Sequence, residues 1–383
     1  MIIKITKIVI RKLISKLQKL VAITPGGSGY LVKWTQAESY LCETVSVAAT
    51  EICGYQEQRE INWIRLTSFQ KSGIFEVNSA FIISIPYSST EINTHRKIYT
   101  ASKVLQPIIS TQKNDTFHAM GSLLRKRKIN RIKLHGKTAL LGAYFADSKN
   151  YFHFWADTIG DIWFLEKMGI DINLLDHILL LYADSKWQNE ILAMCNIPAV
   201  KLVSLSDYDL IECEQLILPI RTKGGQVNPV WLVKALHETS KWCDQQAEKS
   251  TRKIYISRLD ADRRKLINEN DVIDLVSSLG FEIIECSKLT VEEQRKLFAS
   301  ASIVIAPHGA ALTNIVWMHQ RSTLIELLPQ QHAYPCFYDM ARIIGLNYTA
   351  IECTQLDKND NPLFADIHVS LDAVKNTLSN MVN

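Results

Sequence analysis

The feature that most constrains this chain is a regular alternation of short apolar runs and amphipathic helical segments toward its carboxyl-terminal end. The strand-like runs occupy residues 253–257, 281–286, 302–307 and 322–329. One intervening segment begins with a capping box, Thr290 and Glu293, and another ends at Gly280. Strands joined by helices of this length predict a parallel sheet with crossover helices. We therefore expect residues 250–350 to form a doubly wound, nucleotide-type domain.

A similar alternation between residues 138 and 220 predicts a second unit of the same kind. At 383 residues, the chain is longer than a single hydrophobic core usually organises. The expected fold class is α/β, with two Rossmann-like domains built on parallel sheets. The predicted boundaries are 1–24 for an amphipathic helix, 25–235 for the first domain, 236–350 for the second and 351–383 for a tail with a helix.

The positive charge of the chain is concentrated at its amino terminus. The first twenty residues contain six Lys or Arg and no acid, whereas the remainder carries a slight negative net charge. A near-neutral body argues against a nucleic-acid-binding protein. The basic residues recur at helical spacing opposite Ile and Leu, so two interpretations of residues 1–22 stay open. They form either an interfacial helix on an anionic membrane or a surface helix packed on the protein itself.

A second basic cluster, residues 125–137, precedes the first predicted strand of the 138–220 region. It faces the same membrane, or it marks the solvated edge of a hairpin, where lysines discourage aberrant pairing. No run of 18 apolar residues occurs, so the sequence predicts no transmembrane helix.

Neither the cysteines nor the histidines form a metal-binding motif. The eight cysteines include no CxxC pair and the ten histidines no HExxH, so we predict reduced core thiols and no metal site. Asp260 and Asp262 spell a DxD sequence, but the neighbouring arginines would repel a cation.

The turn after the strand at 302–307 is suited to a phosphate group. Its candidate residues are His308, Gly309, Ala310, Ala311 and Asn314. Glycine allows close backbone approach, and the small alanines leave the amides at the start of the following helix uncovered. The alternative is a tight turn with a capped helix.

The loop after the strand at 253–257 carries Ser257, Arg258, Arg263 and Arg264. Arginines at the carboxyl end of a strand can bind a departing nucleoside diphosphate as multidentate donors, or they form exposed ion pairs in a solvated loop. Glu326, inside the run 322–329, is placed to accept hydrogen bonds from two ribose hydroxyls. The alternative is a buried carboxylate paired with an arginine.

In the first domain, His153 and Asp157 lie four residues apart near the start of a helix that follows a strand. That spacing places both side chains on one helix face. A histidine and a carboxylate there could remove a proton from an acceptor hydroxyl, or His153 could cap or pack while Asp157 bonds locally.

Several of these segments together resemble glycosyltransferase family 61, which includes bacterial capsular polysaccharide enzymes and eukaryotic O-linked sugar transferases. The motifs in family order are ISRLDADRRKLINE at 256–269, GF at 280–281, LTVEEQRKLFASA at 289–301, APHGAALTN at 306–314 and IELLP at 325–329. A weaker similarity extends to residues 150–157.

The resemblance implies a GT-B architecture, with two facing Rossmann-like domains, a central cleft and the donor in the second domain. It implies transfer with inversion and without an essential metal or other cofactor. Asp157 becomes the candidate general base, with His153 positioning it or the acceptor, while the arginine loop and the amides of Gly309 to Ala311 stabilise the leaving diphosphate.

We therefore expect a glycosyltransferase that uses a nucleotide-sugar donor, which we take to be UDP-linked. The expected acceptor is a cell-surface polysaccharide or lipid-linked glycan, and the expected location is cytoplasmic, on the inner face of the membrane. The alternative is a non-catalytic nucleotide-sugar-binding or scaffold protein of a polysaccharide assembly, and an oxidoreductase is a distant third.

Overall fold

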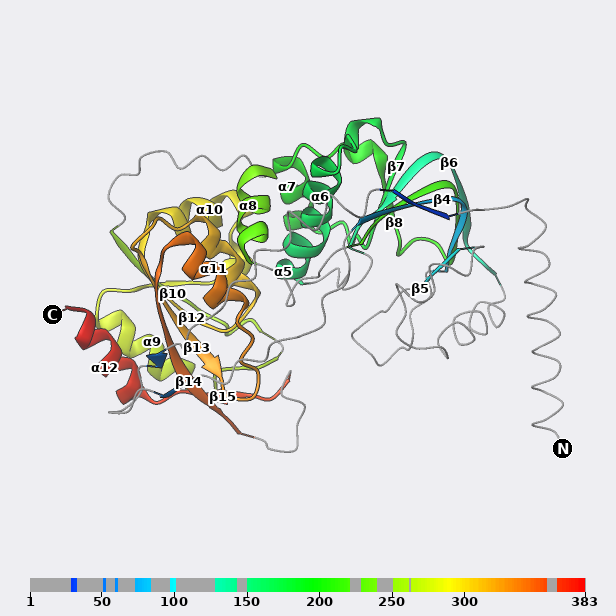
Figure 1. Ribbon diagram of the computed structural model, residues 1–383. Helices are drawn as coiled ribbons and strands as arrows, with labels where there is room; N and C mark the ends of the chain where they lie inside the picture. Colours follow the sequence, from blue (N-terminus) through cyan, green and yellow to red (C-terminus); the bar gives the residue numbers. More distant parts are fainter. Residues whose placement is uncertain are drawn as a thin grey trace, which may run out of the picture.

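The computed structural model has two β-sheets with helices packed between them (Figure 1). The structure describes residues 29–32, 51–52, 59–60, 73–83, 97–100, 128–142, 150–220, 229–239, 251–261, 263–356 and 364–382. The predicted amino-terminal helix at 1–24 and residues 125–127 of the second basic cluster lie outside these ranges. Within them, no helix is long and apolar enough to span a bilayer.

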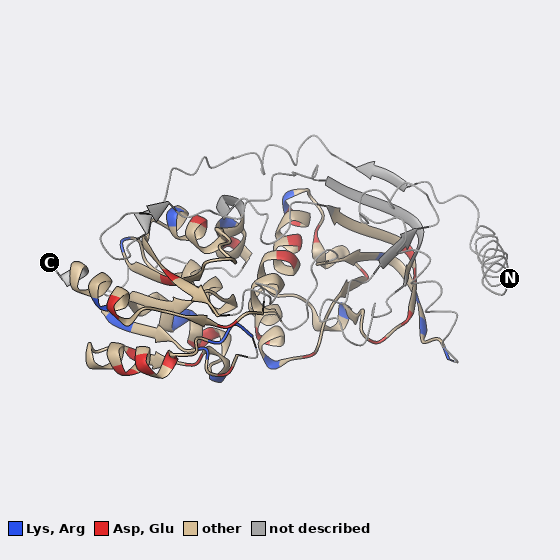
Figure 2. Cartoon of the chain, turned by 90° about the horizontal axis from the view of Figure 1, so that it is seen from below, with Lys and Arg blue, Asp and Glu red and all other residues tan. Residues whose placement is uncertain are grey.

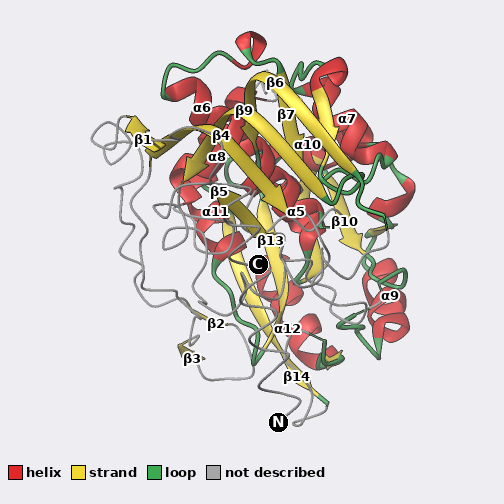
Figure 3. Ribbon diagram, turned by 90° about the vertical axis from the view of Figure 1, so that its right-hand side faces the viewer, coloured by secondary structure: helices red, strands yellow, loops and turns green. Residues whose placement is uncertain are grey.

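The first sheet has the strand order β1-β4-β9-β6-β7-β8, with β5 on the outer side of β4. Its strands are β1 (Gly29–Val32), β4 (Gly73–Ile83), β5 (Lys97–Thr100), β6 (Arg131–Leu140), β7 (His177–Leu180), β8 (Leu202–Ser204) and β9 (Leu210–Ile220). Strands β9, β6, β7 and β8 are mutually parallel, in the 3-2-1-4 order of half a dinucleotide-binding sheet. Figure 3 shows β4, β9, β6 and β7 side by side.

The prediction of a parallel sheet is only partly correct for this region. Strand β4 pairs antiparallel with β9 over almost its whole length, and β1 and β5 pair antiparallel with β4. The first sheet is therefore mixed. These added strands come from the first hundred residues, whose sequence carries no comparable alternation of strands and helices.

Two helical crossover segments connect β6 to β7 and β7 to β8 in the first sheet. They contain α5 (Tyr151–His153), the π-helix η1 (Phe154–Ile159), α6 (Gly160–Lys167), the 3₁₀ helix η2 (Ile172–Leu174), α7 (Lys186–Met194) and the 3₁₀ helix η3 (Ala199–Lys201). The predicted helix after β6 is thus one continuous helical run with a π-helical middle.

The second sheet confirms the doubly wound prediction. Its strands are β10 (Arg252–Ile256), β11 (Glu282–Ile284), β12 (Ala301–Pro307), β13 (Thr323–Pro329) and β14 (Asn347–Gln355). All are parallel and lie in the order β11-β10-β12-β13-β14, which is the 2-1-3-4-5 order of flavodoxin-like sheets. The short strands β2 (Glu51–Ile52), β3 (Arg59–Glu60) and β15 (Ile367–His368) extend its far edge.

The helical segments of the second unit are α9 (Glu269–Ser278), η4 (Cys286–Lys288), α10 (Val291–Ser300), the 3₁₀ helix η5 (Ala310–Trp317), α11 (Cys336–Ile344) and α12 (Leu371–Val382). The predicted capping box at Thr290 and Glu293 is present. Helix α11 ends at Gly345, which has a left-handed φ of 85° that favours glycine. Apolar side chains of α12 join the core of this sheet, so the described part of the tail packs on the second unit.

One hydrophobic cluster runs through both units. Helix α8 (Pro229–Thr239) lies between them, and the cluster includes Trp163 on α6, Leu232 on α8 and Phe337 on α11. Across the junction, the rings of Trp155 and Trp317 meet edge to face with centroids 6.0 Å apart. Burial of such large aromatic surfaces stabilises the association of the two units.

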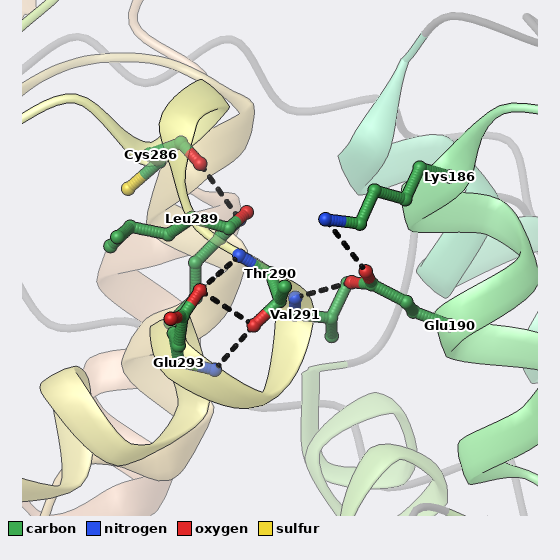
Figure 4. A network of polar contacts seen from close by, with 8 residues as sticks. Lys186, Glu190, Cys286, Leu289, Thr290, Val291 and Glu293 are labelled. Carbon is green, nitrogen blue, oxygen red and sulfur yellow. Dashed lines mark hydrogen bonds and ion pairs between the residues drawn. The ribbon is translucent and has the colours of Figure 1, made fainter.

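A polar contact also bridges the units (Figure 4). The Glu190 carboxylate on α7 accepts a hydrogen bond of 2.7 Å from the backbone amide of Val291, at the start of α10. Helix α10 is therefore capped twice, by Thr290 from its own chain segment and by an acid from the opposite unit. Charged residues of both signs are interspersed over the described parts of both units, in line with the near-neutral body (Figure 2).

Candidate functional site

The turn at residues 308–314, which we predicted to bind phosphate, meets the loop that carries Arg258, Arg263 and Arg264. We call this loop the arginine loop. Gly309 lies directly after β12, and a Cβ atom added to it would be 2.0 Å from Nη1 of Arg258. Only glycine permits this approach, although the φ of 179° is an extended conformation open to any residue. The structure thus brings together two segments, Arg258 and Gly309, that the sequence placed at the ends of neighbouring strands β10 and β12.

Three arginines concentrate positive charge beside this turn. Arg258 Nε, Arg264 Nε and Arg264 Nη1 are buried and have no hydrogen-bond partner among the described residues. Burial lowers the pKa of Arg258, and burial together with the charges of Arg258 and Arg263 lowers the pKa of Arg264 to about 10. Both groups remain protonated at neutral pH. Buried cationic donors without partners favour binding of an anion.

The remaining contacts of the loop fix its shape. The Arg258 amide donates to the buried carboxylate of Glu269 at 2.7 Å, and the Arg258 guanidinium donates to the Arg263 carbonyl at 3.1 Å. The Ser257 hydroxyl accepts from the Leu259 amide, so it shapes the turn. The Arg263 guanidinium lies over the Phe364 ring. Asp262, the second acid of the DxD sequence, is outside the described residues.

His308 and Glu326 form a buried pair behind the turn. His308 Nδ1 lies 2.5 Å from Glu326 Oε1, and Tyr348 donates its hydroxyl to Glu326 Oε2 at 2.7 Å. Glu326 is completely buried. Both Glu326 oxygens therefore have partners within the protein. This favours the alternative of a buried, paired carboxylate over binding to ribose hydroxyls. The partners are His308 and Tyr348, whereas the alternative expected an arginine.

The helix expected after the turn is present as a 3₁₀ helix. Residues Ala310 to Trp317 form a 3₁₀ helix, η5, with Ala310 and Ala311 in its first turn. The side chain of Asn314 points away from the turn. Its amide nitrogen donates to Gln294 at 2.7 Å, and its oxygen accepts from the Tyr151 hydroxyl at 2.9 Å. Asn314 therefore connects η5 with α10 and with the first unit.

The predicted pairing of His153 with Asp157 is present. His153 Nδ1 lies 2.7 Å from Asp157 Oδ2, and the Asn150 side chain caps the helix by accepting from the His153 amide. The two members differ in access, because 24% of the His153 side chain is exposed and only 1% of Asp157. Asp157 belongs to the π-helical turn η1, and such turns are frequent at functional sites.

A line of aromatic contacts joins the two His–carboxylate pairs. Phe152 meets His153 and Phe337, with centroid separations of 5.4 and 5.6 Å, and Phe337 meets His308 at 5.3 Å. Ring contacts thus connect the candidate proton acceptor of the first unit with the residue that precedes Gly309 in the second.

Sequence reasoning missed four residues of this region: Tyr151, Gln294, His332 and Tyr348. Gln294 had a detectable signal, since it falls on the apolar face of α10 between Val291 and Leu297. A polar residue at a buried position requires partners, and Gln294 finds one in Asn314.

The described residues contain no group of three or more His, Cys, Asp or Glu side chains placed to hold a metal ion. Five of the cysteines lie in the described ranges and all are free thiols: Cys195, Cys213, Cys286, Cys336 and Cys353. Burial raises the pKa of Cys195, Cys213 and Cys286 to about 12. These thiols are therefore un-ionised at neutral pH.

Comparison with known proteins agrees with the motifs. A 101-residue stretch is 27% identical to the EGF domain-specific O-linked N-acetylglucosamine transferase of Gallus gallus, covering 25% of this chain and 19% of that protein. A 92-residue stretch is 30% identical to the alpha-1,3-arabinosyltransferase XAT3 of Oryza sativa subsp. japonica, covering 22% and 16%. The chain thus spans less than a fifth of the length of these relatives.

A family model covers more of the chain than these relatives do. It is described as Glycosyltransferase 61, and it matches residues 151–325, from the first residue of α5 into β13. This range includes the His153–Asp157 pair, the arginine loop and the Gly309 turn. The relatives' names and the family match support a glycosyltransferase. Residues 151–325 accordingly match the family that their motifs resemble.

Proposed function

We propose that this protein is an inverting glycosyltransferase that moves a sugar from a nucleotide-sugar donor to a cell-surface polysaccharide or a lipid-linked glycan. The observation that carries the proposal is the meeting of Arg258 with Gly309 in the second unit, close to a His–Asp pair contributed by the first. One unit thus offers an anion site, and the other offers a proton acceptor.

His153 is the better candidate for the general base, and Asp157 for its orienting partner. A general base must reach the acceptor hydroxyl, and His153 is the exposed member of the pair. With Asp157 ionised, Nδ1 of His153 carries the proton that the carboxylate accepts, so Nε2 holds the basic lone pair. This exchanges the roles that the family resemblance implied.

In the proposed reaction, the acceptor oxygen attacks the anomeric carbon from the face opposite the diphosphate. The acceptor proton moves to Nε2 of His153, and the bond between the anomeric carbon and the diphosphate oxygen breaks. The electron pair of that bond leaves with the diphosphate. Arg258 and Arg264 stabilise the developing negative charge, which supports a reaction without an essential metal.

The donor, acceptor and location follow the same proposal. A UDP-linked sugar would place its diphosphate beside Arg258 and Gly309. The acceptor would approach from the side of His153. A protein acting on a lipid-linked glycan would work at the cytoplasmic face of a membrane, where residues 1–22 would provide the attachment, and no nucleic acid would be involved.

The test is transfer or hydrolysis from a panel of nucleotide sugars by the purified full chain, with and without EDTA. We expect release of nucleoside diphosphate from one donor at an equal rate in both conditions. Activity that EDTA abolishes and Mg²⁺ restores would contradict metal independence alone. Donor binding by calorimetry with no turnover on glycan or lipid-linked acceptors would instead favour the non-catalytic binding protein.

A further inference from the structure

We propose that Glu326 is a positioning residue that holds the His308 imidazole as a hydrogen-bond donor toward the diphosphate of the donor. This inference rests on the proposed function, because it assumes that a diphosphate binds at the Gly309 turn. It assigns Glu326 a role behind the binding surface, acting through His308 without contact to the ligand.

The geometry of the pair carries the proposal. The backbone of His308 is fixed by an amide hydrogen bond of 2.9 Å to the Leu327 carbonyl of β13, and its ring is fixed by Glu326 at 2.5 Å. Glu326 is held in turn by the Tyr348 hydroxyl. The register of the sheet supports this arrangement, since Glu326 pairs with Ala306 on one side and Ala350 on the other. A carboxylate fixed on both oxygens holds its partner ring in one orientation.

His308 lies next to the anion site along the chain. His308 precedes Gly309, against which the Arg258 guanidinium packs. When Nδ1 donates its proton to Glu326, a second proton on Nε2 makes the imidazolium a donor. Arg258, Arg264 and His308 would then contribute donors to one diphosphate.

The charged and titratable groups around His308 come from every element packed on it. They are Glu326 on β13, Tyr348 on β14, Cys336 and Asp339 on α11, His332 in the loop before α11, and Arg258 and Arg264 in the arginine loop. Burial and the positive charges of Arg264 and His308 lower the pKa of His332 to about 3, so His332 is neutral. Burial raises the pKa values of Tyr348 and Cys336, which are neutral as well. Glu326 is the carboxylate in direct contact with His308 and favours an imidazolium, while the arginines oppose it.

A consequence for pH follows from this balance. Binding of UDP should weaken as pH rises, because Nε2 is a donor only in the imidazolium. Replacing Glu326 with glutamine removes the negative charge that favours the imidazolium and keeps the side-chain shape. We expect the step in UDP affinity to move down by about one pH unit or more.

The experiment is calorimetric titration of the full-length chain with UDP across mildly acidic to mildly basic pH. The variants are Glu326→Gln, Glu326→Asp as a charge-retaining control, His308→Gln and the double variant Glu326→Gln/His308→Gln. We expect Glu326→Asp to bind more weakly with the step near its original pH. His308→Gln should lose the step, and adding Glu326→Gln to it should change affinity less than about twofold, because both residues act through one ring.

The outcomes separate this inference from the function on which it rests. If the natural sequence binds no nucleoside diphosphate, the proposed function fails. If it binds UDP but Glu326→Gln and Glu326→Asp share its pH profile, only the positioning role fails. Should Glu326→Gln not fold, the imidazole ¹⁵N signals of His308 in the natural sequence decide, assigned through His308→Gln. A neutral ring protonated at Nε2, with Nδ1 as the acceptor, would overturn the proposal.

Discussion

Both units pair a carboxylate with a histidine that follows a central strand along the chain, but the two pairs are built differently. His153 and Asp157 sit four residues apart on one helical run, and the histidine is partly exposed. His308 directly follows β12 and Glu326 lies on the neighbouring strand β13, and both are buried, with 6% and 0% of their side chains exposed. The first pair can exchange a proton with a molecule that enters from outside, whereas the second is enclosed beside the arginine loop.

The surroundings of the pairs sharpen this difference. The Asp157 carboxylate is paired with His153, while the Glu326 carboxylate lies in a region that also contains Arg264, His308 and His332. A site rich in fixed positive charge stabilises an anion, and a neutral histidine oriented by a carboxylate accepts a proton. The same pair of residue types therefore serves two different purposes.

The largest expected effect is on the first pair. Asp157→Asn offers an amide N–H to Nδ1 of His153 and so favours a proton on Nε2, which removes the base. His153→Gln removes it directly. We expect either variant to lower turnover by about two to four orders of magnitude and to leave UDP affinity within about twofold. The measurement is single-turnover transfer beside calorimetry.

Asp161→Asn is the matched control for that comparison. Asp161 is buried one helical turn beyond Asp157, and its Oδ2 accepts from the Gly142 amide, a contact that asparagine can keep. Turnover within about threefold of the natural sequence is expected. An equal loss in Asp161→Asn and Asp157→Asn would mean that the effect is structural, and near-normal turnover of His153→Gln would remove His153 as the base.

The second prediction concerns the anion site. Gly309→Ala places a methyl group where Nη1 of Arg258 now lies, so the guanidinium must move. Because a hydrogen bond to a charged group contributes roughly 1.5–3 kcal/mol, we expect about 10- to 100-fold weaker UDP binding in Gly309→Ala and in Arg258→Ala. Calorimetry with UDP measures this change.

The double variant Gly309→Ala/Arg258→Ala tests whether the two changes act on the same group. Once the guanidinium is absent, the extra methyl group has nothing to displace, so the losses should not add. Additive losses, or unchanged binding in Arg258→Ala, would show that the arginine loop does not serve the turn.

The sequence alone predicted the second unit far better than the first. The elements of residues 250–345 are indicated by periodicity, by the capping box at Thr290 and by the helix stop at Gly280, all of which are local signals. The antiparallel pairing of β4 with β9 joins residues more than a hundred positions apart and leaves no local signal. The first sheet was therefore predicted only where strands alternate with helices.

The site shows the same division between local and distant contacts. The spacing of His153 and Asp157 on one helix was enough to predict their contact. The contact of Glu326 with His308 and Tyr348 depends on the register of three parallel strands, which the sequence does not specify. Its polarity inside an apolar run marked Glu326 as unusual, but did not identify its partners.

The smallest expected effect tests whether the two pairs can work together, because that requires the units to keep their relative position. Glu190 contributes to this through its carboxylate at the start of α10. Glu190→Ala leaves the Val291 amide without that cap, and we expect a loss of about 1 kcal/mol in the free energy of unfolding, read from the denaturant midpoint. Lys186→Ala is the matched control.

The Lys186 ammonium lies 3.8 Å from Glu190 and its side chain is 81% exposed, so its removal should change the free energy of unfolding by less than about 0.5 kcal/mol.

The Glu190→Ala variant also tests whether the two pairs have separate roles. If the cap only stabilises the junction, Glu190→Ala keeps its UDP affinity, since the anion site lies within the second unit. Its turnover should fall more than its affinity, because turnover alone requires the exposed histidine of one unit to face the diphosphate held by the other. Equal losses in affinity and turnover would indicate damage within the second unit. They would contradict separate roles for the two pairs.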